Sequence, residues 1–401
     1  MAYPESRLQR GYAQLEMVQA TVSTSVSTVT ADSGTPFIAG MVGFQIRIDG
    51  AFYTIASFTS TTIVVLTTVI GTKNAVAAQV YYWGVIPHAA GVATVVAADC
   101  FLSTDLVLKP SRAIAQRPDK TGSYSQPVPG ITKRGGTWRM RCTLAGSGSA
   151  GTAPDIDPFL VALFGKVATV VGGASVTYAL EDGSPSLTLW DFNALAAADQ
   201  QVAIGCIVTR ATIEWGQDFA FIDLSGDAKY VLRSSAFSAE DATAKSGLTA
   251  FPTEPSTQTT AGTSVRGYKG TITLDAQTYT TFRSGRIEIA IARELDKAVW
   301  NSDYPGPVAG GLRSVSATLT HTDDDSANLL ALKNKLLVGT PFDATIAIGA
   351  TAGNIWTISL NDCIGEPADY GNGQTHRTAD LAFSAYPTSA TSKNEIALAL
   401  T

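Results

Sequence analysis

The chain has 401 residues, of which 45% are hydrophobic and 15% are charged. This hydrophobic share excludes an intrinsically disordered chain, and the length predicts several cores rather than one. The 28 basic and 34 acidic residues give a net charge of −6, which disfavours tight binding of nucleic-acid phosphates.

No stretch approaches the roughly 18 apolar residues of a membrane span. The opening sequence MAYPESRLQRGYAQLE is polar where a signal peptide would be apolar. We therefore expect a protein that is made in the cytosol and has no membrane partner.

Residues 1–87 are predicted to form a small, separate β-module, placed on the outside of whatever the rest of the chain builds. Within residues 44–83, apolar residues alternate on either side of Asp49-Gly50. An Asp-Gly pair supplies the positive φ angles of a two-residue hairpin turn. Two further strand patterns complete the predicted module.

Beyond the module the sequence carries a degenerate internal repeat, copy 1 at 88–237 and copy 2 at 265–401, joined by a linker at 238–264 that is rich in Ser, Thr, Ala and Gly. In copy 1, a strand LVLKP and a Pro/Gly loop precede the strand RGGTWRMRCTL and the helix-like DPFLVALFGK. In copy 2, RIEIAI and a second Pro/Gly loop precede RSVSATLTH and SANLLALKNKLL. Later strands also correspond, so the pattern predicts a mainly β fold of two β-sandwiches, each with a short flanking helix.

Residues that carry chemistry are sparse. The three histidines lie far apart, and no His or Cys pair has metal-ligand spacing. No GxSxG pattern marks a nucleophile. We expect the four cysteines to be buried thiols, and we expect no enzyme, no metal and no cofactor.

One motif, GSGSAG at 146–151, matches the GxGxxG of dinucleotide-binding folds. Asp155 and Asp157 follow it and would place carboxylates where a pyrophosphate needs the positive end of a helix. They are better explained as favourable charges at a helix start, with the glycines forming a loop.

The series KRGGTWRMRCTLAGSGSAGTAPDIDPFLVALFG, followed by SVTYAL, resembles the tail tube (major tail) proteins of long-tailed bacteriophages. The C-terminal RTADLAFSAYPTSATSKNEIALAL is similar to their closing strand and terminal arm. The resemblance covers roughly residues 95–401.

The resemblance implies a β-sandwich whose inner sheet joins those of its neighbours into a barrel around a lumen that carries the genome. It implies a virion tail location after assembly in the host cytoplasm, and tape measure, tail terminator and baseplate proteins as partners. Such rings contain six single-domain subunits, so the internal repeat predicts rings of three chains, with DNA passing through non-specifically. Three chains at −6 each also predict an acidic wall that repels DNA.

The loops 110–136 and 292–311 are too long for plain connections. The resemblance implies that they reach the next ring. The candidate contact residues are Arg112, Arg117, Lys120, Lys133, Arg134, Trp300, Tyr304 and Arg313.

Two other readings stay open. One is another tail or baseplate component, such as a distal tail or tube-capping protein. The other is a nucleotide-binding enzyme that uses GSGSAG.

Overall fold

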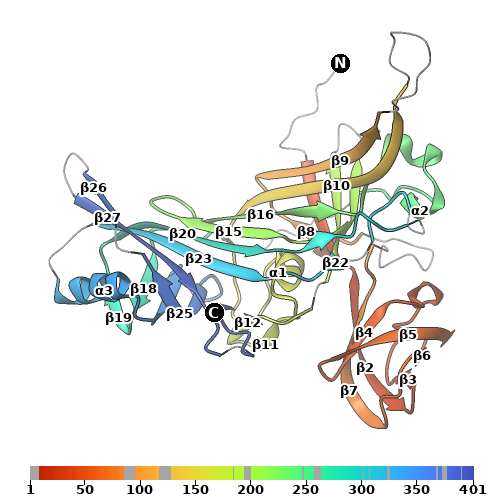
Figure 1. Ribbon diagram of the computed structural model, residues 1–401, viewed down its shortest axis with the longest axis horizontal. Helices are drawn as coiled ribbons and strands as arrows, with labels where there is room; N and C mark the ends of the chain where they lie inside the picture. Colours follow the sequence, from red (N-terminus) through yellow and green to blue (C-terminus); the bar gives the residue numbers. More distant parts are fainter. Residues whose placement is uncertain are drawn as a thin grey trace.

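The computed structural model describes residues 9–84, 95–116, 128–183, 185–193, 200–245, 248–256, 263–300, 302–306, 308–322, 326–366, 369–372, 377–389 and 391–401. Strands far outnumber helices in these ranges (Figure 1), which confirms the predicted mainly β class. No helix there is long and apolar enough to cross a membrane.

A closed barrel, the barrel module, is built from six strands in the order β2-β3-β6-β5-β4-β7. Asp49 and Gly50 have φ angles of 51° and 85°, which confirms the predicted hairpin turn. The Ser/Thr-rich strands β2 and β3 were not among the predicted ones. The elements are β2 (Met17–Ser25), β3 (Thr28–Ala31), η2 (Ala39–Met41), β4 (Gln45–Ile48), β5 (Ala51–Ser60), β6 (Ile63–Leu66) and β7 (Lys73–Tyr81).

The barrel module interrupts copy 1 instead of preceding it. Strands β1 (Gln9–Leu15) and β8 (Cys100–Phe101) flank the barrel in sequence and pair with each other, with Gly11 facing Phe101. β1 also pairs along its whole length with β13 (Leu187–Asn193). The predicted boundary at residue 87 is therefore corrected, because residues 9–15 belong to copy 1 and the barrel is inserted between two of its strands.

A buried carboxylate, Glu16, holds both connections of the barrel module to copy 1. Its side chain is 0% exposed and accepts backbone N–H bonds from Gly84 (2.6 Å) and Gly205 (2.7 Å). The hydroxyls of Ser186 and Thr188 also donate to it. Burial raises the pKa of Glu16 from 4.5 to about 7.

Copy 1 is a two-layer β-sandwich. One layer has the strand order β9-β10-β16-β15, and the other has the order β17-β14-β13-β1-β8. The elements not yet given are η3 (Ala97–Asp99), β9 (Asp105–Ala115), β10 (Gly130–Thr143), α1 (Asp157–Phe164), β11 (Thr169–Val171), β12 (Ser175–Ala179), β14 (Gln201–Cys206), β15 (Arg210–Trp215), β16 (Phe221–Ala228) and β17 (Tyr230–Arg233).

Copy 2 repeats this order. One layer runs β20-β23-β27-β25 and the other runs β28-β25-β24-β18-β19, with β25 passing from one layer to the other. The turn between β18 and β19 takes the place of the inserted barrel module. The elements are β18 (Gly270–Leu274), β19 (Gln277–Tyr279), β20 (Phe282–Ile291), β21 (Glu294–Leu295), β22 (Val308–Ala309), β23 (Arg313–Thr322), α3 (Ala327–Val338), β24 (Phe342–Ile348), β25 (Trp356–Gly365), β26 (Asp369–Asn372), β27 (Arg377–Ala385) and β28 (Ile396–Leu400).

The two copies share one sheet, because β15 of copy 1 pairs with β20 of copy 2. We call the joint between these strands the internal junction. The resulting layer β9-β10-β16-β15-β20-β23-β27, completed by the end of β25 and by β26, is the long sheet that crosses the molecule in Figure 1.

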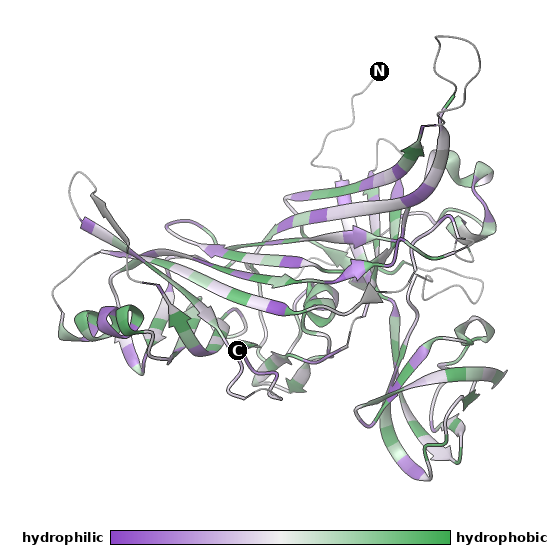
Figure 2. Ribbon diagram, in the orientation of Figure 1, coloured by the Kyte–Doolittle hydropathy of each residue, from purple (hydrophilic) through white to green (hydrophobic). Residues whose placement is uncertain are grey.

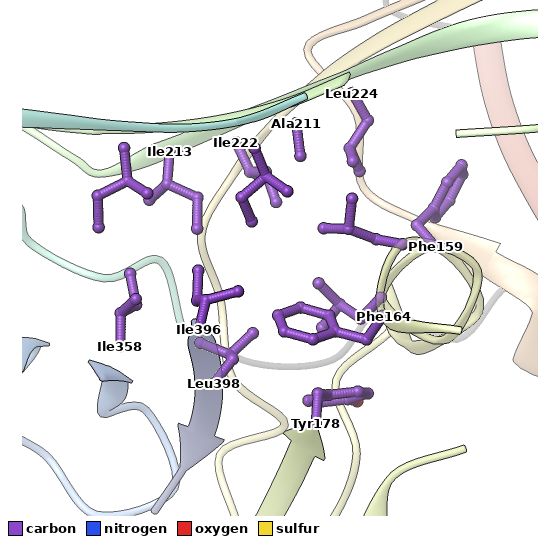
Figure 3. Close-up of a cluster of buried hydrophobic side chains, with 14 of the residues drawn as sticks. Phe159, Phe164, Tyr178, Ala211, Ile213, Ile222, Leu224, Ile358, Ile396 and Leu398 are labelled. Carbon is purple, nitrogen blue, oxygen red and sulfur yellow. The ribbon is translucent and has the colours of Figure 1, made fainter. Parts of the chain in front are cut away.

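The core lies between the long sheet and the second layers. Figure 3 shows Phe164 of α1 pointing toward Ile222 of the long sheet and, on the copy 2 side, toward Ile396 and Leu398. Phe159 packs against Trp138 of the long sheet. Helix α1 is therefore packed between the copies. The predicted helices at 157 and 326 are confirmed, and each ends at a glycine with positive φ.

The segment predicted as a linker also covers copy 1. It begins within η5 (Ser234–Ala239) and contains α2 (Ala242–Lys245). Phe251 packs edge-on against Trp190 with ring centroids 6.0 Å apart, and Glu254 pairs with Arg10 at 2.9 Å. The segment connects the copies, but its described part is folded onto the second layer of copy 1.

Candidate assembly interface

The internal junction is a regular antiparallel ladder. It runs from Arg210 facing Ala290 to Trp215 facing Gly285. A Cβ atom on Gly285 would lie 2.2 Å from the Trp215 ring. The glycine therefore lets the indole cross the joint, and the two copies form one continuous sheet.

One face of the long sheet is exposed and polar. On β23, Ser314, Ser316 and Thr318 are exposed, whereas Val315 and Leu319, on the opposite face, are buried. This alternation follows from the two-residue period of a strand, and Figure 2 shows it as alternating bands along the long sheet. The copy 2 half of the exposed face is therefore rich in hydroxyls.

The copy 1 half of the same face, together with β20 across the internal junction, carries a paired charge network. Arg141 lies 3.1 Å from Asp223, and its guanidinium covers the Phe221 ring. Arg210 lies 2.6 Å from Glu288 across the internal junction, and this hydrogen bond lowers the pKa of Glu288. The network joins four arginines to four carboxylates: Arg139, Arg141, Arg210 and Arg286 with Asp105, Glu214, Asp223 and Glu288.

The residues of this network were absent from the sequence-based candidates. The signal was present, because WRMRCT and RIEI alternate charged with apolar residues. Only the cross-strand register shows that each arginine meets a carboxylate.

Two predicted loop residues, Lys133 and Arg134, are engaged inside the chain. Lys133 Nζ donates to the carbonyl oxygens of Val299 (2.7 Å) and Ser302. Arg134 lies 2.8 Å from Glu240. The 292–311 loop of copy 2 is thereby held on β10 of copy 1.

The predicted aromatic anchors differ from each other. Tyr304 is 4% exposed, donates its hydroxyl to Asp241 at 2.8 Å and packs edge-on against Tyr230. It is therefore not the exposed anchor that the sequence led us to expect. Trp300 is 94% exposed and fits that expectation better.

The remaining predicted contacts are distributed along the chain. Arg112 is exposed on β9, which pairs with β10 alone in the described part of the chain. Arg313 is half-buried and pairs with Glu395 at 2.9 Å, so it joins two parts of copy 2. Arg117 and Lys120 lie outside the described residues.

Glu181 joins the barrel module to both copies. Its carboxylate pairs with Arg47 of the barrel module (2.8 Å) and with Lys393 of copy 2 (2.7 Å). Partial burial alone would raise the pKa of Glu181, but these two partners lower it to about 2. The barrel module is therefore fixed at the side of the sandwich.

The GSGSAG loop packs between the copies. A Cβ atom on Gly146 would lie 2.0 Å from the Gly353 carbonyl oxygen. Asp155 accepts the Leu102 N–H at 3.1 Å, and Asp157 accepts the Tyr178 hydroxyl. The predicted loop role of the glycines thus includes a close contact between the copies.

All four cysteines are free and buried, as the sequence predicted. His321 is buried, and the other two histidines lie outside the described residues. Among the described residues, no group of three His, Cys, Asp or Glu side chains is placed to hold a metal ion.

No protein-family model matches the chain, and no curated protein matches it. Among solved structures, the chain is similar to one from the virion of a native gene transfer agent (GTA) particle, with a TM-score of 0.26 and 17% identity. The match covers 31% of this chain and 95% of that chain. At this TM-score the likeness carries no conclusion about this chain.

Proposed function

We propose that this chain is a structural component of a phage-like virion and, more narrowly, a subunit of a tail tube. Three chains would form a ring in which their long sheets close into one β-barrel. Stacked rings would then form the conduit through which the genome passes. The proposal assigns the chain no reaction and no cofactor.

The internal junction is the observation that carries the proposal. Copies 1 and 2 share the same strand order, so the joint between β15 and β20 can recur between the copy 2 end of one chain and β9 of the next. Unpaired sheet edges favour uncontrolled association, and a closed ring removes them. Six copies around the ring, as in the family that the sequence resembles, require three chains.

The exposed face of the long sheet would line the lumen. Release of counterions drives phosphate binding only where basic side chains are free to replace them. Here the four arginines of the network are each paired with a carboxylate, and the copy 2 half is rich in hydroxyls. The sequence predicted an acidic wall that repels DNA. We propose instead a wall whose opposite charges neutralise one another, and such a wall would also let DNA pass.

The location of the barrel module in the chain supports its placement on the outside of the tube. It lies on the side of the second layers, away from the exposed face of the long sheet (Figure 1). In a closed barrel that side is the outside. Contacts with the next ring would then fall to the β9–β10 hairpin and to exposed Trp300, with tape measure, terminator and baseplate proteins as further partners.

Electron microscopy of the purified chain tests this function. We expect hollow tubes or stacked rings with a continuous inner wall. A distal tail or tube-capping protein with the same sheet would give single rings that do not stack. A chain that stays monomeric at every concentration, or that forms solid aggregates without a lumen, would contradict the proposal.

A further inference from the structure

Copy 1 contains a register shift where its second layer passes into the long sheet. Thr209 donates its N–H to the Ser225 carbonyl oxygen at 3.0 Å, whereas Thr212 faces Asp223. Because Arg210 also faces Ser225, Thr209 and Arg210 both oppose this one residue, which is a β-bulge. Gly205, near the end of β14, precedes it with a φ of 63°.

Copy 2 contains the same shift. Glu366 donates its N–H to the Ala382 carbonyl oxygen at 3.1 Å, whereas Asp369 faces Asp380. Asp362 precedes it with a φ of 45°. The shifted hydrogen bond thus lies four residues after the residue with positive φ in both copies.

This common bulge fixes which residues correspond. Glu366 takes the position of Thr209, and Asp369 takes the position of Thr212. The correspondence comes from hydrogen bonds and strand register, so it does not depend on the low sequence similarity of the copies.

At the internal junction, β20 is the strand that pairs with the edge of copy 1. Ile291 donates its N–H to the Thr209 carbonyl oxygen at 2.8 Å, and Glu288 faces Thr212. In the described part of the chain, β26 pairs with β27 alone, so no strand occupies this place beside copy 2.

The strand that corresponds to β20 is β9, which ends the long sheet at the other side of the molecule. Arg313, at the start of β23, faces Ile291, and Arg134 on β10 faces Arg112. Because Arg134 and Arg313 correspond, Arg112 takes the position of Ile291.

We infer that β9 of a second copy of this chain pairs with the β25–β26 edge, with Glu366 opposite Arg112. This position opposes unlike charges, although the pair does not resemble its internal counterpart, Thr209 and Ile291. Opposite charges directly across an antiparallel pair stabilise it, and like charges destabilise it.

An apolar pair on α3 supports the same neighbour independently. Leu163 and Phe164, just before the glycine that ends α1, are each 1% exposed, and Figure 3 shows Phe164 beside Ile396 and Leu398 of copy 2. Leu337 and Val338, just before the glycine that ends α3, are 66% and 77% exposed. α3 lies at the copy 2 end of the molecule (Figure 1), where a second chain would cover this pair as copy 2 covers α1.

The charges on the two sheet edges also limit which edges can pair. β9 carries Lys109 and Arg112, and the β25–β26 edge carries the exposed carboxylate Glu366. Two β9 edges would bring cations together, and two β25–β26 edges would bring two Glu366 carboxylates together. The chain therefore favours head-to-tail association, which is the geometry that closes a ring.

This inference deepens the proposed function and is tested by reversing the charges. Arg112→Glu and Glu366→Arg each place like charges opposite one another, and the double variant restores an unlike pair. We expect each single variant to weaken association between chains roughly tenfold, and the double variant to recover to within about threefold of wild type. Sedimentation velocity over a concentration series measures the association.

A control variant separates this effect from net charge. Lys73→Glu reverses a cation of equal charge that pairs with Asp49 on the barrel module, and it should leave association unchanged. Circular dichroism establishes that each variant is folded. A second probe, a photo-crosslinking amino acid in place of Val338, should couple one chain to copy 1 of another.

The outcomes distinguish the inference from the proposed function. If wild type forms rings of three but the single variants associate as wild type does, the charge pairing is wrong and the tube function stands. If the double variant rescues association but microscopy shows open chains without rings, the pairing stands and the tube function fails. A wild-type chain that never associates contradicts both.

Discussion

The Glu16 carboxylate should make the stability of the chain fall as pH rises toward neutrality. Its pKa is about 7 in the folded chain and 4.5 ordinarily, because burial disfavours the charged form. Between these values the folded state binds more protons than the unfolded state. The free energy of unfolding therefore falls with rising pH in this window, by roughly 2 kcal/mol between pH 5 and 7.5.

Glu16→Gln removes this titration. The amide keeps the size of the side chain, but its NH₂ group must face hydroxyls or backbone N–H groups that now donate to Glu16, such as Gly84 or Gly205. One buried N–H left without an acceptor costs about 1–3 kcal/mol. The variant should be less stable than wild type at pH 5, and this difference should shrink by roughly 2 kcal/mol at pH 7.5.

Urea denaturation at pH 5, 6, 7 and 7.5, followed by tryptophan fluorescence, measures the difference. Asp49→Asn is a matched control, since Asp49 is an exposed carboxylate on the barrel module and asparagine tolerates its positive φ. Equal pH dependence in wild type and Glu16→Gln would refute the role given to Glu16. Burial lowers the pKa of Lys229, which donates to the Gly84 carbonyl oxygen nearby.

Three further predictions address the sheet and the insertion. Gly285→Val should destabilise the chain by about 1–3 kcal/mol in the same assay, because its side chain would overlap the Trp215 ring at the internal junction. The double variant Glu214→Gln, Asp223→Asn should bind duplex DNA more tightly than wild type in low salt, since it frees paired arginines, and fluorescence anisotropy that shows no gain would contradict the paired-wall account. Replacing residues 17–82 by a short turn should leave a folded chain that still forms tubes, because β1 and β8 can pair as β18 and β19 do. These tubes should be thinner than those of wild type. Loss of tubes on electron microscopy would show that the barrel module belongs to the interface between rings.

Local patterns in the sequence were enough for the elements that depend on local chemistry. The Asp49-Gly50 turn, the helices at 157 and 326 and the alternating strands follow from turn geometry and periodicity. The repeat also indicated matched strand order, because each copy keeps its elements in the same sequence.

Strand pairing between residues far apart in the sequence could not be predicted. β1 lies next to the barrel module in sequence but pairs with β13, more than 170 residues away, and no local pattern specifies such a partner. The prolines around Tyr304 led us to expect an exposed side chain in a loop, but contacts with Asp241 and Tyr230 bury this side chain. The charge network likewise depends on register, which a single sequence does not reveal.

Counting the chains in one ring tests the central claim most directly. Electron cryomicroscopy of assembled tubes gives this number from the cross-section, together with the continuity of the inner wall. We predict three chains per ring, with β9 of each chain paired to the β25–β26 edge of its neighbour in one closed barrel. Six chains per ring, or an inner wall not built from the long sheet, would contradict the account.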